Sequence, residues 1–114
     1  MNPTRSRAVM AMLLLAVLAA AAVGSTLALA GPGDAQVTIR NFDFHPMAIT
    51  VPVGATVTWK NLDGEPHTVT SIDGSFRSEA LDEGDSYRHA FTKPGVYKYL
   101  CTIHPRMVAV VTAK

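Results

Sequence analysis

The sequence predicts an all-β sandwich of about seven or eight strands for residues 31–114. Short runs that alternate apolar and polar residues recur at intervals of roughly ten residues. Turn residues, above all Gly, Pro and Asp, separate these runs, and no useful helical periodicity follows residue 30. The chain has one cysteine, so no internal disulfide can staple the domain. The sandwich therefore needs a packed core or a bound metal for stability.

Seven strands are expected in chain order, over residues 37–40, 47–51, 56–60, 67–72, 86–91, 96–101 and 108–112. A Gly-Pro-Gly-Asp lead-in precedes the first, and Pro-Val-Gly closes the second. Asp-Gly follows the third and the fourth, and Thr-Lys-Pro-Gly follows the fifth. The third strand alternates most clearly, with Val57 and Trp59 on the core face. The irregular residues 73–85 are expected to be anchored by Phe76 and Leu81.

Residues 1–30 are expected to be a secretory signal peptide rather than part of the domain. Arg5 and Arg7 precede an uncharged apolar run over residues 8–24, and Ala-Leu-Ala ends the segment at residue 30. The apolar run is long, so an uncleaved membrane anchor is the alternative. The sequence therefore predicts an exported, periplasmic domain over residues 31–114, which contacts the membrane only if this segment is kept.

Charge and motif content exclude several classes of function. Without Arg5 and Arg7, the ten basic residues become eight, against nine acidic ones. No basic patch of the kind that binds nucleic acid is present. The sequence also lacks a Ser-His-Asp order, a glycine-rich phosphate loop and paired carboxylates, so we do not expect an enzyme.

Metal-ligating residue types gather near the end of the chain. Cys101, His104 and Met107 lie within seven residues, and a further imidazole, His67, lies upstream. Two His, one Cys and a weak Met form the ligand set of a blue-copper electron-transfer site. The expected strands place both segments in loops at one end of the sandwich. Zinc in a Cys-His-His site is the alternative metal.

Residues 37–112 resemble the cupredoxins, the type I blue-copper proteins, and their spacing is most similar to that of the amicyanin-like members. The matching motifs are Gly-Ala-Thr-Val-Thr-Trp-Lys-Asn at 54–61, Pro-His-Thr-Val at 66–69, Phe-Thr-Lys-Pro-Gly-Val-Tyr-Lys-Tyr-Leu-Cys at 91–101, and the C-x-x-H-x-x-M loop. The resemblance implies a Greek-key sandwich in which His67, Cys101 and His104 bind copper and Met107 is a weak axial ligand. It also implies that His104 lies nearest solvent, that electrons enter and leave through its exposed ring edge, and that it can protonate and leave Cu(I).

The function implied by this resemblance is that of a mobile, monomeric carrier of single electrons between redox proteins. An amine-oxidising dehydrogenase as donor and a cytochrome as acceptor are the partners of amicyanin-like carriers. The alternative function is a periplasmic copper carrier or buffer that exchanges metal rather than electrons. The mature chain is poor in the clustered Met and His motifs that would favour that alternative. A metal-free binding module is the third alternative.

Several residues depart from the family pattern or have an ordinary structural explanation. Thr68 stands where Asn is frequent, which puts the side-chain brace of the cysteine loop in question, and Ala109 stands where Gly is usual. His45, before a proline, is expected at the surface, and His89 is expected to be a partly buried structural residue. Met47 fits either the core or the rim of the copper site.

Overall fold

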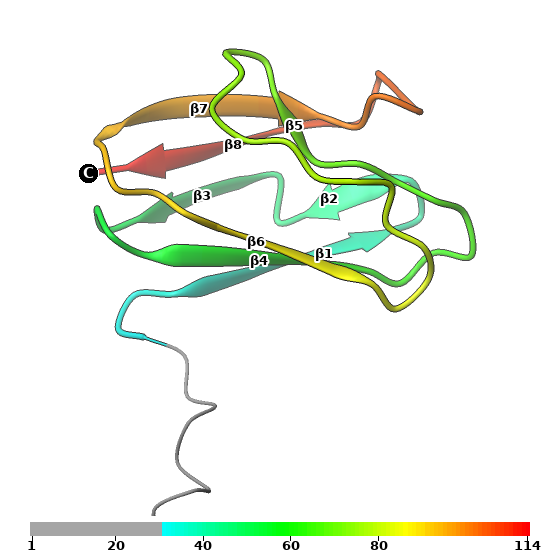
Figure 1. Cartoon of the computed structure of the whole chain (residues 1–114), viewed down its shortest axis with the longest axis horizontal. Coiled ribbons are helices and arrows are strands. Elements are labelled where there is room, and N and C mark those ends of the chain that lie inside the picture. The colour runs from blue at the N-terminus through cyan, green and yellow to red at the C-terminus, as the bar shows by residue number, and fades with distance from the viewer. Residues whose placement is uncertain (1–30) are drawn as a thin grey trace, which may run out of the picture. The chain divides into compact units, whose positions relative to one another are not determined.

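The computed structural model describes residues 31–114, which form two stacked four-stranded sheets (Figure 1). The first sheet has the order β2-β1-β4-β6 and the second the order β3-β8-β7-β5. The strands are β1 (Ala35–Arg40), β2 (Asp43–His45), β3 (Ala48–Val51), β4 (Thr56–Asn61), β5 (Thr70–Ser71), β6 (Ser86–Ala90), β7 (Gly95–Leu100) and β8 (Val108–Ala113). This confirms the all-β sandwich. The signal peptide predicted for residues 1–30 lies outside the described residues and stays a prediction.

Each sheet combines parallel and antiparallel pairs. β1 runs parallel to β4, with Val37 opposite Trp59, and β3 runs parallel to β8. The remaining neighbours are antiparallel. The chain changes sheet between β2 and β3, at the cis peptide bond between His45 and Pro46. No helix long and apolar enough to cross a membrane occurs among residues 31–114.

An aromatic core centred on Trp59 holds the two sheets together. The Trp59 side chain is completely buried, and its ring centroid lies 5.5 Å from that of Tyr99 and 5.7 Å from those of Phe76 and Tyr87. Aromatic pairs at such separations contribute beyond their buried area. Leu81 is buried beside this cluster, as Phe76 is, so both expected anchors of the 73–85 segment are confirmed.

The segment around His67 differs from the strand expected over residues 67–72. Only Thr70–Ser71 forms regular strand pairing, whereas His67 makes an isolated antiparallel bridge with Leu81. The backbone N–H of His67 donates to Leu81 O at 3.0 Å, and Leu81 N–H donates to His67 O at 2.7 Å. Ser78 continues this pairing, because its N–H donates to Val69 O and its hydroxyl accepts from Val69 N–H. The 73–85 segment thus pairs with one edge of this segment, while β7 pairs with the other edge at Thr70 and Ser71.

β2 is a strand that the sequence did not predict. It is three residues long and pairs with β1 through a two-residue turn at Asn41 and Phe42. Its brevity, with a single buried side chain at Phe44, leaves too few positions for an alternating pattern to be recognised.

Candidate metal centre

Two loops at one end of the sandwich bring the predicted ligands together (Figure 1). Cys101 directly follows β7, Met107 directly precedes β8, and His104 lies in the loop between them. His67 lies in the connection between β4 of the first sheet and β5 of the second. Residues 67, 101 and 104 form a cluster capable of holding a metal ion.

The three ligand atoms form a compact triangle. Cys101 Sγ lies 3.8 Å from Nδ1 of His67 and 3.8 Å from Nδ1 of His104, and the two Nδ1 atoms are 3.2 Å apart. The point equidistant from the corners of such a triangle lies about 2.1 Å from each, close to the metal–nitrogen and metal–sulfur distances typical of protein sites. The side chains therefore fit one metal ion without moving.

His67 is held with its Nδ1 atom directed at this triangle. Its Nε2 atom lies 2.9 Å from Oδ2 of Asp63, while the imidazole itself is completely buried. Burial opposes ionisation of Asp63, but hydrogen bonds from Phe42 N–H, Asn41 N–H and His67 outweigh it and hold the pKa of Asp63 below its usual range. An ionised carboxylate only accepts hydrogen bonds, so Nε2 of His67 is the donor. The lone pair of the neutral ring is then on Nδ1, where a metal would bind.

The sulfur of Cys101 is buried and receives a hydrogen bond from the neighbouring ligand loop. The backbone N–H of Thr68 donates to Cys101 Sγ at 3.3 Å. Thr68 Oγ1 lies 2.8 Å from Thr102 Oγ1 and also accepts the Thr102 N–H at 2.8 Å. The threonine that stands in place of asparagine therefore does brace the cysteine loop, through Thr102.

The loop over residues 101–107 is closed by its own backbone. Cys101 N–H donates to Met107 O at 3.1 Å, and Met107 N–H donates to His104 O at 2.9 Å. These bonds keep Met107 beside the cluster, and its side chain is 3% exposed. His104 is only half-buried, unlike His67 and Cys101, so the centre reaches the surface through this ring.

Three further residues contact or support the predicted ligands, and the sequence did not mark them as parts of the metal centre. Asp63 orients His67, as described, and the Phe42 ring lies edge-on against both ligand imidazoles. Asn61 is completely buried; its amide donates to Glu65 O and Leu81 O and accepts from Asp63 N–H. The spacing of four residues between Asp63 and His67 was the one signal available in the sequence.

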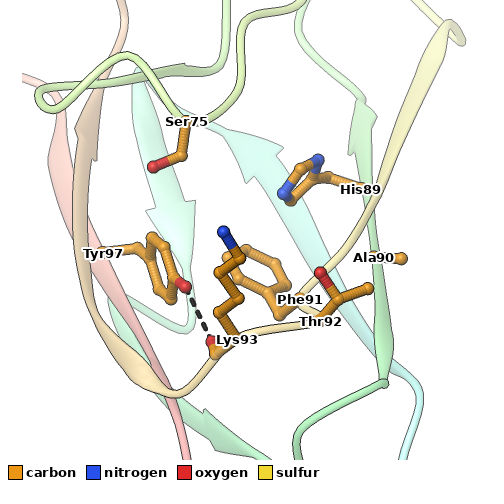
Figure 2. Close-up of a pocket in the computed structure, with 7 residues that line it drawn as sticks. All are labelled: Ser75, His89, Ala90, Phe91, Thr92, Lys93 and Tyr97. Atoms are coloured by element: carbon orange, nitrogen blue, oxygen red, sulfur yellow. Dashed lines mark hydrogen bonds between the residues drawn. The ribbon is translucent and has the colours of Figure 1, made fainter.

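The other two histidines lie away from the cluster. His45 is exposed, and its Nε2 atom lies 3.1 Å from Arg40 O. His89 lines a hollow of about 320 Å³ in which the Lys93 side chain extends between Tyr97 and His89 (Figure 2). Burial against Phe76 and Phe91, each with its ring centroid 4.8 Å away, lowers the pKa of His89. The surface position of His45 and the partial burial of His89 are confirmed.

Met47 lies in neither of the two expected places. Its side chain is 51% exposed and borders an apolar groove on the outer face of the second sheet, with Ile72, Tyr99 and Val108 among the lining residues. Its carbonyl accepts a hydrogen bond from Val110 N–H, so the residue continues the pairing of β3 with β8. Met47 is a surface residue of that sheet.

The family model of the cupredoxin-like domain matches residues 8–113. The chain is a cupredoxin. A purple cupredoxin from Nitrosopumilus maritimus is 39% identical, with a TM-score of 0.68 over 71% of this chain and 100% of that one. A reduced mutant of amicyanin is 28% identical, with a TM-score of 0.68 over 74% of this chain and 85% of that one. No curated protein matches the chain.

One larger copper protein also shares the fold. The copper-containing nitrite reductase NirK from Thermus scotoductus SA-01 is 30% identical, with a TM-score of 0.69 over 82% of this chain. The match covers only 26% of that protein, so this cupredoxin corresponds to a part of it. The family and the thiolate-imidazole donor set together specify one type I copper ion as the cofactor.

Proposed function

We propose that this cupredoxin is a periplasmic carrier of single electrons between redox proteins, with His67, Cys101 and His104 as copper ligands and Met107 as a weak axial ligand. The observation that carries the proposal is the triangle of ligand atoms, 3.2 to 3.8 Å on a side, in which only His104 reaches the surface. Bound copper supplies a Cu(II)/Cu(I) couple that gains and loses one electron. The exported location is supported by the character of residues 1–30.

The chain's own residues keep the site similar in both oxidation states. Asp63 holds His67, Thr68 N–H holds the Cys101 sulfur, and backbone hydrogen bonds close the loop that carries His104. Ligands fixed by such outer contacts cannot rearrange freely when the metal changes charge. Little reorganisation favours rapid electron transfer, and four protein side chains leave no open position for a substrate. We therefore propose a carrier and not an enzyme.

The half-buried His104 is the proposed point of electron exchange. Ile103, the preceding residue in the chain, is 46% exposed and adds apolar surface to the same loop. A small, transient contact between partners can form on such a surface. By analogy with amicyanin-like carriers, a dehydrogenase would donate the electron and a cytochrome would accept it, and the carrier would act as a monomer.

Electron self-exchange between reduced and oxidised protein tests this proposal without a named partner. The broadening of NMR signals in mixtures of the two forms gives the rate. Ile103→Lys places a charge beside His104, and repulsion between two such surfaces should slow exchange about tenfold or more at low salt. Val96→Lys, at a position on β7 that is 63% exposed, is the matched control and should leave the rate close to wild type.

Two results would contradict the proposal. If both lysine variants exchange electrons at the wild-type rate, His104 is not the point of exchange. If the wild-type copper protein exchanges metal with a chelator faster than it exchanges electrons, a copper carrier or buffer is the better description.

A further inference from the structure

The β1–β2 turn has an unusual backbone that ends in contact with the metal centre. Asn41 and Phe42 both have positive φ angles, 53° and 59°. Asn tolerates this left-handed region, whereas a bulky residue such as Phe is a genuine outlier there. Two-residue hairpin turns with positive φ at both residues (type I′ turns) favour Gly at the second position. An outlier of this kind is a reason to look for a function.

A single carboxylate holds the turn in this conformation. Asp63 Oδ1 accepts the Asn41 N–H at 2.7 Å, and Asp63 Oδ2 accepts the Phe42 N–H at 2.9 Å. The same Oδ2 atom accepts the Nε2–H of His67 at 2.9 Å. Asp63 is itself fixed, because its N–H donates to the buried Asn61 side chain. One residue therefore seats the turn and a copper ligand together.

The seated turn places the Phe42 ring against both imidazoles. Its centroid lies 5.3 Å from that of His67 and 5.0 Å from that of His104, with interplanar angles of 87° and 88°. The rest of the Phe42 side chain is open to solvent, since the residue is 48% exposed. Phe42 thus stands between the two ligand rings and water on the β1–β2 side.

We propose that Phe42, seated by Asp63, is a positioning residue that covers the copper centre and raises its reduction potential. This inference rests on the proposed function. The oxidised centre, a dication with one thiolate, carries one more positive charge than the reduced centre. An apolar cover disfavours the more highly charged state because it excludes the water that would solvate it. The strained turn is maintained because it carries this ring.

Phe42→Gly removes the aromatic ring but keeps the conformation of the turn. Glycine adopts the positive φ without strain, so the unfolding midpoint of the copper-free protein should not fall. The reduction potential should fall, so that the ratio of reduced to oxidised protein at a fixed solution potential drops about threefold to tenfold, or about 30–60 mV for a one-electron couple. Val53→Gly changes an exposed apolar turn residue at the opposite end of the sandwich and should leave the potential unchanged.

Asp63→Asn tests how the ring is seated. An amide cannot accept all three hydrogen bonds, so the turn loses its anchor. Phe42→Gly should then lower the potential less in the Asp63→Asn background than in the wild-type protein, because coupled residues are not additive. If Phe42→Gly has the same effect in both backgrounds, Asp63 does not seat the ring.

The failure of this inference differs from the failure of the proposed function. If the wild-type copper protein shows no reversible blue absorption, the proposed function fails, and the inference fails with it. If the wild-type protein is blue and cycles, but Phe42→Gly has the wild-type potential, only the role of Phe42 is refuted. A blue Phe42→Gly protein with a lower potential and an undiminished unfolding midpoint supports the inference.

Discussion

Replacing Asn61 with alanine should destabilise the copper-free domain by about 3–4 kcal/mol. The buried side chain makes three hydrogen bonds, to Glu65 O, Leu81 O and Asp63 N–H, at 2.8 to 2.9 Å. Each contributes about 1 kcal/mol net, and the vacated space adds a further cost. Leu81 O keeps one partner, the His67 N–H, which limits the loss. A domain of this size has about 4–13 kcal/mol of total stability.

Denaturant unfolding of the copper-free protein measures this loss, with fluorescence of the single tryptophan, Trp59, as the probe. The metal must be absent because it would add stability by mass action. Gln36→Ala, at an exposed position on β1, is the control and should change stability by less than about 0.5 kcal/mol. A loss below about 1 kcal/mol for Asn61→Ala would show that this residue does not hold the β4–β5 connection to the 73–85 segment.

Three further changes have expected outcomes. Met107→Leu should keep copper and change the reduction potential, as voltammetry would show, because Met107 is the proposed weak ligand; an unchanged potential would remove it from the ligand set. Thr68→Val should destabilise the copper-free protein by about 1–2 kcal/mol, because the buried Thr68 hydroxyl binds Thr102 twice; thermal unfolding checks this, and an unchanged midpoint would contradict the brace. Burial raises the pKa of Tyr99 to about 12, and its hydroxyl has no hydrogen-bond partner among the described residues. The unfolded chain loses this proton first as pH rises through 10, so stability should fall by about 1.4 kcal/mol per pH unit between about 10 and 12. Tyr99→Phe should fold at least as stably and lose this part of the alkaline dependence; an unchanged alkaline profile would refute the assignment.

The core of the sandwich could be predicted because its signal is local. Val57 and Trp59 alternate with polar residues on β4, and both are completely buried. Phe76 and Leu81 are apolar residues in a segment otherwise rich in turn and charged residues, which marked them as anchors. Periodicity reports which side of a strand faces the core, and it is sufficient where the strand is long enough to repeat.

The ligands could also be predicted, whereas the residues that hold them could not. A thiolate, an imidazole and a thioether at fixed spacing are rare, so Cys101, His104 and Met107 were recognisable without coordinates. Asp63 and Asn61 are common residue types whose roles depend on partners far along the chain, such as Asn41 and Leu81. Sequence spacing carries no information about such contacts.

The segment at His67 illustrates the same limit for secondary structure. A strand over residues 67–72 was expected from its alternation, and its side chains do alternate in burial near Thr70 and Ser71. What differs is the extent of the pairing, because only Thr70 and Ser71 form a regular ladder with β7, while His67 and Thr70 make isolated bridges to Leu81 and Arg77 on the other edge. How far a strand's pairing extends depends on its tertiary partners, which local alternation does not report.

Visible absorption during copper titration tests the central claim most directly. One equivalent of Cu(II), added to the domain over residues 31–114, should give an intense blue band that bleaches with ascorbate and returns on oxidation. Cys101→Ser should remove this band, because the band requires the copper–thiolate bond. If Cys101→Ser were still intensely blue, or if the wild-type protein bound copper without colour, the assignment of a type I electron-transfer site to His67, Cys101, His104 and Met107 would be wrong.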